Sequence, residues 1–301
     1  MQVNWLIHIN YKRRMLNISG STLQNVLNGL MSRYTERVPD VKAILGAMEK
    51  ENLISSPEDV ENDHIAFRTL GVPNLGIASL EKIFLHFGYQ KKEYYFFAEK
   101  KLDAWWYAPP QPKLPRIFIS ELRVPDLPEN IQKIILSYTS EIKSDPVDAL
   151  KLDEGEAVDH FLHSGLWRLP SWADYEMLAK SSEYAAWVIY NRYYLNHFTM
   201  SVHNLPGEFR DIEFFTAWLL QEGFKMNDAG GTIKTSADGL LRQSSTVASL
   251  VDARFADDSI HAIPGSYIEF AERKKGREGF EAANADKIFE STYAEQIQKN
   301  R

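Results

Sequence analysis

The stretch Asp63-His64-Ile65-Ala66-Phe67-Arg68 decides the prediction of the fold, because it has the pattern of a β-strand and carries a potential metal ligand. Successive side chains of a strand alternate between its two faces, so His64, Ala66 and Arg68 share one face. A histidine and an arginine on one face could hold a metal ion and an acidic substrate in the same cavity. The stretch therefore predicts both a strand and a site.

Two further stretches have the same character, namely Asn196-His197-Phe198-Thr199 and Gly265-Ser266-Tyr267-Ile268-Glu269-Phe270. Two histidines and one carboxylate that leave open positions on the ion form the facial triad of non-haem Fe(II) oxygenases. Glu269 stands in a mostly apolar strand, where a metal ion would stabilise a carboxylate that is expensive to bury alone. A salt bridge to Arg273 or Arg254 is the alternative explanation.

The composition is that of an ordinary soluble globular protein, with 44% hydrophobic and 25% charged residues among 301. A net charge of −7 argues against a nucleic-acid scaffold, because phosphate binding needs a basic field. The chain has no cysteine, so it fits a reducing compartment. It has no apolar run of about 18 residues and only a poor signal peptide, with Met15 as an alternative start. These features predict a soluble cytoplasmic protein without a nucleic-acid or membrane partner.

The order of the expected elements repeats along the chain. A strand, a helix, a Gly-aromatic pair and three strands follow His64, and the same order follows His197. The sequence therefore predicts an α+β fold in which two βαβββ modules curl into one half-barrel. The expected parts are an N-terminal helical segment (1–62), the first module (63–125), a helical insert (126–195), the second module (196–273) and a C-terminal tail (274–301).

Glu121 is the rival to the three expected ligands, because it stands in the last strand of the first module as Glu269 does in the second. It could be a fourth ligand, an acceptor for a ligand histidine, or a partner of Arg123. His203 is six residues beyond His197, roughly 20 Å along a strand, and is too far to share an ion.

Three residues are candidates for binding the substrate. The guanidinium of Arg68 could meet a carboxylate in a bidentate fork, although a structural salt bridge is equally compatible with the sequence. Gln243 and Ser245 are two residues apart in an expected strand, so they share one face. They could donate hydrogen bonds to the same carboxylate, or line the end of a loop.

The motifs DHIAFRTL, NHFTMSV, LLRQSSTVA, IPGSYIEFAER and NADKIFEST resemble, in this order, those of the 2-oxoadipate dioxygenase/decarboxylases, also called hydroxyglutarate synthases. The repeated modules resemble the glyoxalase/vicinal oxygen chelate superfamily to which such enzymes belong. The resemblance covers roughly residues 20–295, and the chain looks like a short form of the family. It implies His64, His197 and Glu269 as iron ligands and Arg68 as a contact of the substrate carboxylate.

The expected function is that of an Fe(II)-dependent dioxygenase that decarboxylates a 2-oxo acid, with 2-oxoadipate as substrate and 2-hydroxyglutarate and CO2 as products. Its partners would be a small 2-oxo acid and O2. Two alternatives stay open at this point: a glyoxalase-like lyase or isomerase in which the metal is only a Lewis acid, and a non-enzymatic small-molecule binder of the same fold.

Overall fold

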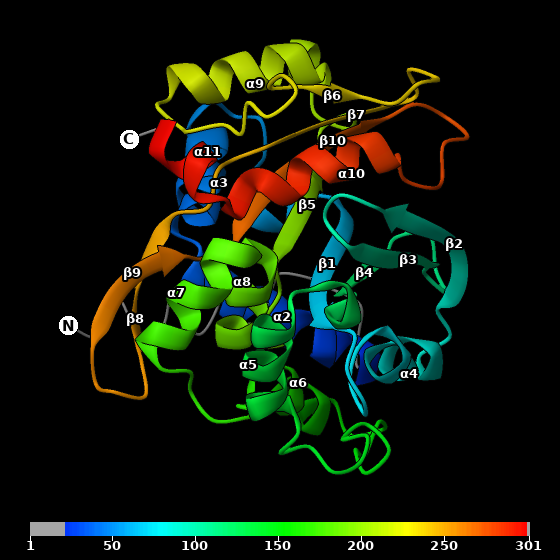
Figure 1. Ribbon diagram of the computed structural model, residues 1–301. Helices are drawn as coiled ribbons and strands as arrows, with labels where there is room; N and C mark the ends of the chain where they lie inside the picture. Colours follow the sequence, from blue (N-terminus) through cyan, green and yellow to red (C-terminus); the bar gives the residue numbers. More distant parts are fainter. Residues whose placement is uncertain (1–21, 300–301) are drawn as a thin grey trace, which may run out of the picture.

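The computed structural model describes residues 22–299, which form a large mixed sheet with helices on both of its faces (Figure 1). The choice between Met1 and Met15 lies outside these residues. The strands are β1 (Asn62–Leu70), β2 (Gln90–Phe97), β3 (Leu102–Ala108), β4 (Arg116–Leu122), β5 (His197–Ser201), β6 (Lys234–Thr235), β7 (Leu241–Ser245), β8 (Leu250–Arg254), β9 (Ile260–Pro264) and β10 (Tyr267–Arg273).

Helices precede, connect and follow the strands. The α-helices are α2 (Thr22–Arg37), α3 (Pro39–Lys50), α4 (Ile77–His86), α5 (Glu129–Thr139), α6 (Gly155–His163), α7 (Trp172–Ser181), α8 (Glu183–Asn191), α9 (Ile212–Gln221), α10 (Ala282–Ile288) and α11 (Ala294–Lys299). Short 3-10 turns are η1 (Pro57–Asp59), η2 (Val124–Asp126), η3 (Gly207–Arg210) and η4 (Phe289–Thr292). No described helix is long and apolar enough to cross a membrane.

The eight-stranded sheet has the order β2-β3-β4-β1-β5-β10-β7-β6. The two modules meet where β1 pairs antiparallel with β5. In each module the first strand also pairs in parallel with the last one, β1 with β4 and β5 with β10. As a result β1, β5 and β10, the three strands that carry the predicted ligands, lie next to one another at the centre of the sheet.

The predicted repeat is confirmed: β1-α4-β2-β3-β4 is followed by β5-α9-β6-β7-β10, which makes the fold α+β as expected. Gly88 and Gly223 follow the two helices with φ of 86° and 89°, a left-handed conformation that favours glycine at a helix end. The second module also carries the hairpin β8–β9, a separate two-stranded sheet that the sequence analysis did not predict. The division into five segments stays a prediction.

The two faces of the sheet have different neighbours. Phe67 of β1 packs on Phe84 of α4, with ring centroids 5.4 Å apart, and Phe270 of β10 packs on Phe215 of α9 at 5.1 Å. Side chains adjacent in a strand point the other way, so His64 must lie on the face opposite to α4 and α9.

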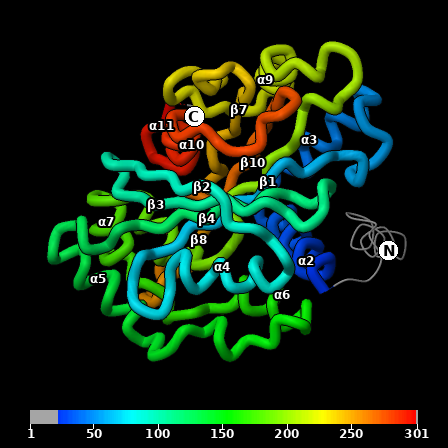
Figure 2. Tube along the Cα trace, turned by 90° about the vertical axis from the view of Figure 1, so that its right-hand side faces the viewer, coloured from blue at the N-terminus to red at the C-terminus, as the bar shows by residue number. Residues whose placement is uncertain are grey.

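That opposite face is covered by α8 of the helical insert (Figure 1) and by the C-terminal segment that contains α10 and η4 (Figures 1 and 2). Helix α8 packs against β1, and α10 contacts β2, β6 and β7. Trp187 of α8 is fully buried, as expected for a tryptophan that packs the helical insert on the sheet. A buried cavity between the sheet and these two covers is where the predicted ligands meet.

Candidate metal centre

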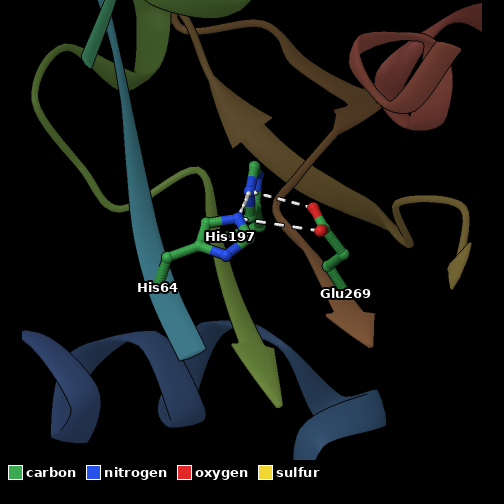
Figure 3. A group of neighbouring side chains, drawn as sticks. All are labelled: His64, His197 and Glu269. Atoms are coloured by element: carbon green, nitrogen blue, oxygen red, sulfur yellow. Dashed lines mark hydrogen bonds and ion pairs between the residues drawn. The ribbon is translucent and has the colours of Figure 1, made fainter. Parts of the chain in front are cut away.

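The side chains of His64, His197 and Glu269 converge in this cavity from β1, β5 and β10 (Figure 3). The two Nε2 atoms are 3.4 Å apart. The Glu269 oxygens lie 3.6 Å from Nε2 of His64 and 3.2 Å from Nε2 of His197. The three donor atoms all lie within 4.8 Å of one another, and all three residues are buried. The strand pairing explains this convergence. His197 lies opposite Ala66 on β1 and Tyr267 on β10. His64 and Glu269 are each two residues away from these partners, so they lie on the same face of the sheet as His197.

Burial sets the charge of each donor. It lowers the pKa of His64 and lowers that of His197 well below the ordinary histidine value, so both imidazoles are neutral. It raises the pKa of Glu269 to about 8, although the amide of Gln243, which donates to Oε1 at 2.6 Å, opposes this. Neutral imidazoles, together with a carboxyl group whose negative charge burial disfavours, are donors that a divalent metal ion would stabilise.

The alternative of a salt bridge is not what the structure contains. Arg273 donates from Nε to Asp63 Oδ1 at 2.6 Å, and Arg254 pairs with Asp258. Glu269 therefore has Gln243 and the two histidines as its neighbours. The donor set of two imidazole nitrogens and one carboxylate oxygen fits iron(II), for which such a facial set with open positions is typical.

The outer nitrogen of each histidine is also occupied. Nδ1 of His64 lies 2.8 Å from Asp63 Oδ2, and Nδ1 of His197 lies 3.0 Å from Asn196 Oδ1. Because a carboxylate and an amide oxygen both accept, each Nδ1 carries the proton and each Nε2 presents its lone pair to the cavity. Asp63 and Asn196 each directly precede a predicted ligand in the sequence, but neither was among the predicted site residues.

The rest of the cavity is largely apolar. Besides the three donors and Gln243 it is lined by Phe118, Tyr267, Phe280, Ala285, Ile288 and Phe289. Four of these residues come from the segment 280–289, which belongs to the predicted C-terminal tail. This segment therefore closes the site from the side opposite to the sheet.

The three predicted substrate contacts occupy different positions. Gln243 lines the cavity and donates to Glu269. Arg68 is buried beside the cavity, where Nη1 donates to Thr292 Oγ1 at 2.8 Å and Nη2 to the Phe289 carbonyl at 3.0 Å. Ser245 is buried and does not line the cavity, and its Oγ is 2.9 Å from Oγ of Ser291. All three thus contact the donors or the C-terminal segment, but only Gln243 faces the cavity itself.

Glu121 has none of the three roles considered for it. Its Oε2 accepts the backbone N–H of Ile77 at 2.7 Å, at the start of α4. Arg123 pairs instead with Asp103 and Asp126. Because α4 lies on the face opposite to the donors, Glu121 stabilises a helix end. Within residues 22–299, the group of His64, His197 and Glu269 contains no fourth candidate ligand.

Paired βαβββ modules define a fold of the glyoxalase/vicinal oxygen chelate kind, with two histidines and a glutamate as a candidate metal site at the centre of the shared sheet. The fold is similar to that of a glyoxalase superfamily protein from Ralstonia eutropha, with a TM-score of 0.73 over 91% of this chain and 94% of the other at 19% identity. At this identity the likeness concerns the fold alone.

The chain belongs to the 2-oxoadipate dioxygenase/decarboxylase family, whose sequence profile matches residues 26–276. It is 38% identical over 308 residues to the chloroplastic 2-oxoadipate dioxygenase/decarboxylase of Arabidopsis thaliana, covering 93% of this chain and 80% of that protein. It also resembles the crystal structure of the hydroxyglutarate synthase of Oryza sativa in complex with 2-oxoadipate, with a TM-score of 0.82, 38% identity and coverage of 92% and 93%. The predicted family is confirmed.

The predicted cytoplasmic location is contradicted, because the Arabidopsis relative is a chloroplastic protein. The prediction depended on the absence of cysteine and of a long apolar run. Both features fit the interior of a plastid as well as they fit the cytoplasm, since neither place requires disulfides or a membrane span. Composition therefore could not choose between these compartments.

Proposed function

We propose that the protein is an Fe(II)-dependent oxygenase that converts 2-oxoadipate and O2 into 2-hydroxyglutarate and CO2. The observation that carries the proposal is the convergence of His64, His197 and Glu269 in one buried cavity. Membership of the 2-oxoadipate dioxygenase/decarboxylase family and similarity to a hydroxyglutarate synthase crystallised with 2-oxoadipate support the choice of substrate.

The reaction balances without another reductant. The carboxylate next to the keto group leaves as CO2, and the keto carbon becomes the new carboxylate with one atom of O2. The other oxygen atom becomes the hydroxyl group on the neighbouring carbon. When bound, the iron supplies the oxygen chemistry. The protein has to hold the ion, orient the 2-oxo acid and keep water out.

His64, His197 and Glu269 would hold the ion from the sheet side and leave the cavity side open for the 2-oxo acid and O2. The side chains of Phe118, Phe280 and other apolar residues close that space and exclude water from it. Gln243 fixes one oxygen of Glu269, which keeps the carboxylate oriented toward the two imidazoles.

Arg68 would anchor the second carboxylate of the substrate. Its Nε is a buried polar atom without a hydrogen-bond partner in the described part of the chain, and the hydroxyl of Tyr267 lies close to its guanidinium. Burial raises the pKa of Tyr267, and the nearby charge of Arg68 opposes this. A substrate carboxylate that reached past Tyr267 from the cavity would accept a hydrogen bond from this nitrogen. Ser245, through Ser291, would support the C-terminal segment beside it.

Isotope labelling tests this proposal. The iron-loaded protein is supplied with 2-oxoadipate under ¹⁸O2, and the product is analysed by mass spectrometry. We expect 2-hydroxyglutarate with one label in the hydroxyl group and one in the carboxylate. An unlabelled product, or a substrate rearranged without consumption of O2, would reject the oxygenase and favour a metal-dependent lyase or isomerase.

A further inference from the structure

Asp63 lies between the candidate ligand His64 and two arginines. Its Oδ2 is 2.8 Å from Nδ1 of His64, whereas its Oδ1 accepts from Nε of Arg273 at 2.6 Å and from Nη1 of Arg116 at 3.3 Å. The carboxylate is buried, and although burial raises its pKa, the charge of Arg273 and the hydrogen bond from His64 more than offset this and lower it. Asp63 is therefore a charged carboxylate that accepts hydrogen bonds with both of its oxygens.

The same two arginines hold the start of the C-terminal segment. Arg273 donates from Nη1 to the carbonyl of Gly279 at 2.6 Å. Arg116 donates from Nε to the carbonyl of Glu278 and from Nη2 to the Glu278 carboxylate, both at 3.0 Å. Each guanidinium thus spans from Asp63 to the turn that precedes α10.

Phe280 brings this turn into contact with the candidate ligand. Its ring lies at right angles to the imidazole of His64, with centroids 4.7 Å apart, and 5.0 Å from the guanidinium carbon of Arg273. Phe280 also lines the cavity. His64 therefore contacts Asp63 at its edge and Phe280 at the cavity wall, and Arg273 contacts both of these residues.

Among residues 22–299, no such connection to the C-terminal segment is made by the other histidine. Nδ1 of His197 meets the neutral amide oxygen of Asn196, and its ring packs on Tyr267, with centroids 4.8 Å apart, within the same sheet. The two candidate ligands are thus held differently: His197 by neighbours in the sheet, and His64 by a charged residue that is shared with the C-terminal segment.

We propose that Asp63 is a positioning residue that fixes His64 for metal binding and couples the bound ion to the seating of Glu278–Phe280 over the cavity. The inference rests on the proposed function only in requiring an ion at this site. A carboxylate that accepts from a ligand imidazole fixes its orientation and increases its basicity. An ion that fixes His64 would, through Asp63 and the two arginines, also fix the turn. By the same coupling, seating of the turn over the cavity would increase the affinity for the ion.

The first measurement is the affinity for Co(II), determined by competition with a chromophoric chelator. We expect Asp63→Asn to weaken Co(II) binding about ten- to a hundredfold relative to wild type. Glu121→Gln is the matched control, a carboxylate of the same sheet that caps α4, and should stay within about twofold because it touches no donor. Wild-type protein that fails to bind Co(II) would overturn the proposed function and this inference together. Equal binding by wild type and Asp63→Asn would overturn this inference alone.

A second variant serves if Asp63→Asn does not fold, because that change leaves Arg273 without its buried counter-charge. Asp63→Asn/Arg273→Gln removes both charges and should show the same loss of Co(II) affinity.

Limited trypsin digestion adds a second readout, since Lys274 and Lys275 are exposed directly before the turn. Co(II) should slow cleavage there at least severalfold in the wild type and not in the double variant. Equal protection in both proteins would contradict the coupling.

Discussion

The hydroxyl group of Thr199 lies 3.0 Å from Nε2 of His64, the nitrogen that faces the candidate metal centre. The two residues are cross-strand partners between β5 and β1. Asp63 accepts a hydrogen bond from Nδ1 of His64, so the proton of the neutral ring is on Nδ1 and Nε2 is an acceptor. The hydroxyl of Thr199 therefore donates to Nε2 while no ion is bound. A metal ion on Nε2 would replace this hydrogen bond.

Substitution Thr199→Val separates these two situations. It removes the hydroxyl at nearly constant volume, so the metal-free protein should lose about 1 kcal/mol of stability, the net value of a typical hydrogen bond. The metal-bound protein should lose less, and the shift in Tm on addition of Co(II) should be larger than in the wild type. Thermal unfolding with and without Co(II) measures this. Loss of Co(II) binding in the variant would instead make Thr199 a part of the site.

Metal affinity should depend on pH through Glu269. Burial raises the pKa of this carboxyl group to about 8, so the metal-free protein holds a proton there at pH 7, and the ion must displace it. Affinity should therefore fall by up to roughly tenfold for each pH unit below 8 and level off above it. The histidines add no such slope near neutrality, because their pKa values are lowered. Co(II) titrations at several pH values test this, and a flat profile between pH 6 and 8 would contradict it.

Substitution Arg68→Ala should keep the metal but raise KM. Charged hydrogen bonds contribute about 1.5–3 kcal/mol, so kcat/KM for 2-oxoadipate should fall roughly ten- to a hundredfold. Arg68→Lys should recover only part of this, because lysine keeps the charge without the fork. Steady-state kinetics together with metal analysis provide the check. Near wild-type kinetics of Arg68→Ala on every 2-oxo acid tested would make Arg68 a purely structural residue that holds Thr292.

Substitution Glu121→Gln should affect stability and not the metal. The carboxylate accepts the N–H of Ile77 at the N-terminus of α4, where a negative charge is favourable. Its loss should lower the free energy of unfolding by about 1 kcal/mol. Metal content and denaturant unfolding of the same preparation give both values. If the variant lost its metal, Glu121 would be a ligand, as a glyoxalase-like enzyme would require.

The sheet and the convergence of the three candidate ligands could be predicted because each depends on local pattern. His64, His197 and Glu269 stand in strands with clear alternation, and the matched order of elements around them indicated that the modules share one site. Gly88 and Gly223, each placed after the helix of its module, were a further indication of the repeat.

The cover of the site could not be predicted in the same way. Phe280 is an isolated apolar residue in a polar stretch, so no periodicity reveals that it packs on His64. The hairpin of β8 and β9 alternates only weakly in burial and pairs outside the main sheet. Asp63 gave one signal that was not used, namely a carboxylate adjacent to a candidate ligand histidine. Contacts between distant segments, such as Asp63 with Arg273, come from the fold alone.

The most direct test of the central claim is simultaneous measurement of O2 uptake and CO2 release by the anaerobically iron-loaded protein on addition of 2-oxoadipate. His197→Ala, loaded in the same way, is the control. We expect equal amounts of O2 consumed and CO2 released by the wild type, 2-hydroxyglutarate as the product, and neither gas exchange nor bound iron in the variant. Turnover of 2-oxoadipate without O2 uptake, or full activity of His197→Ala, would contradict the account.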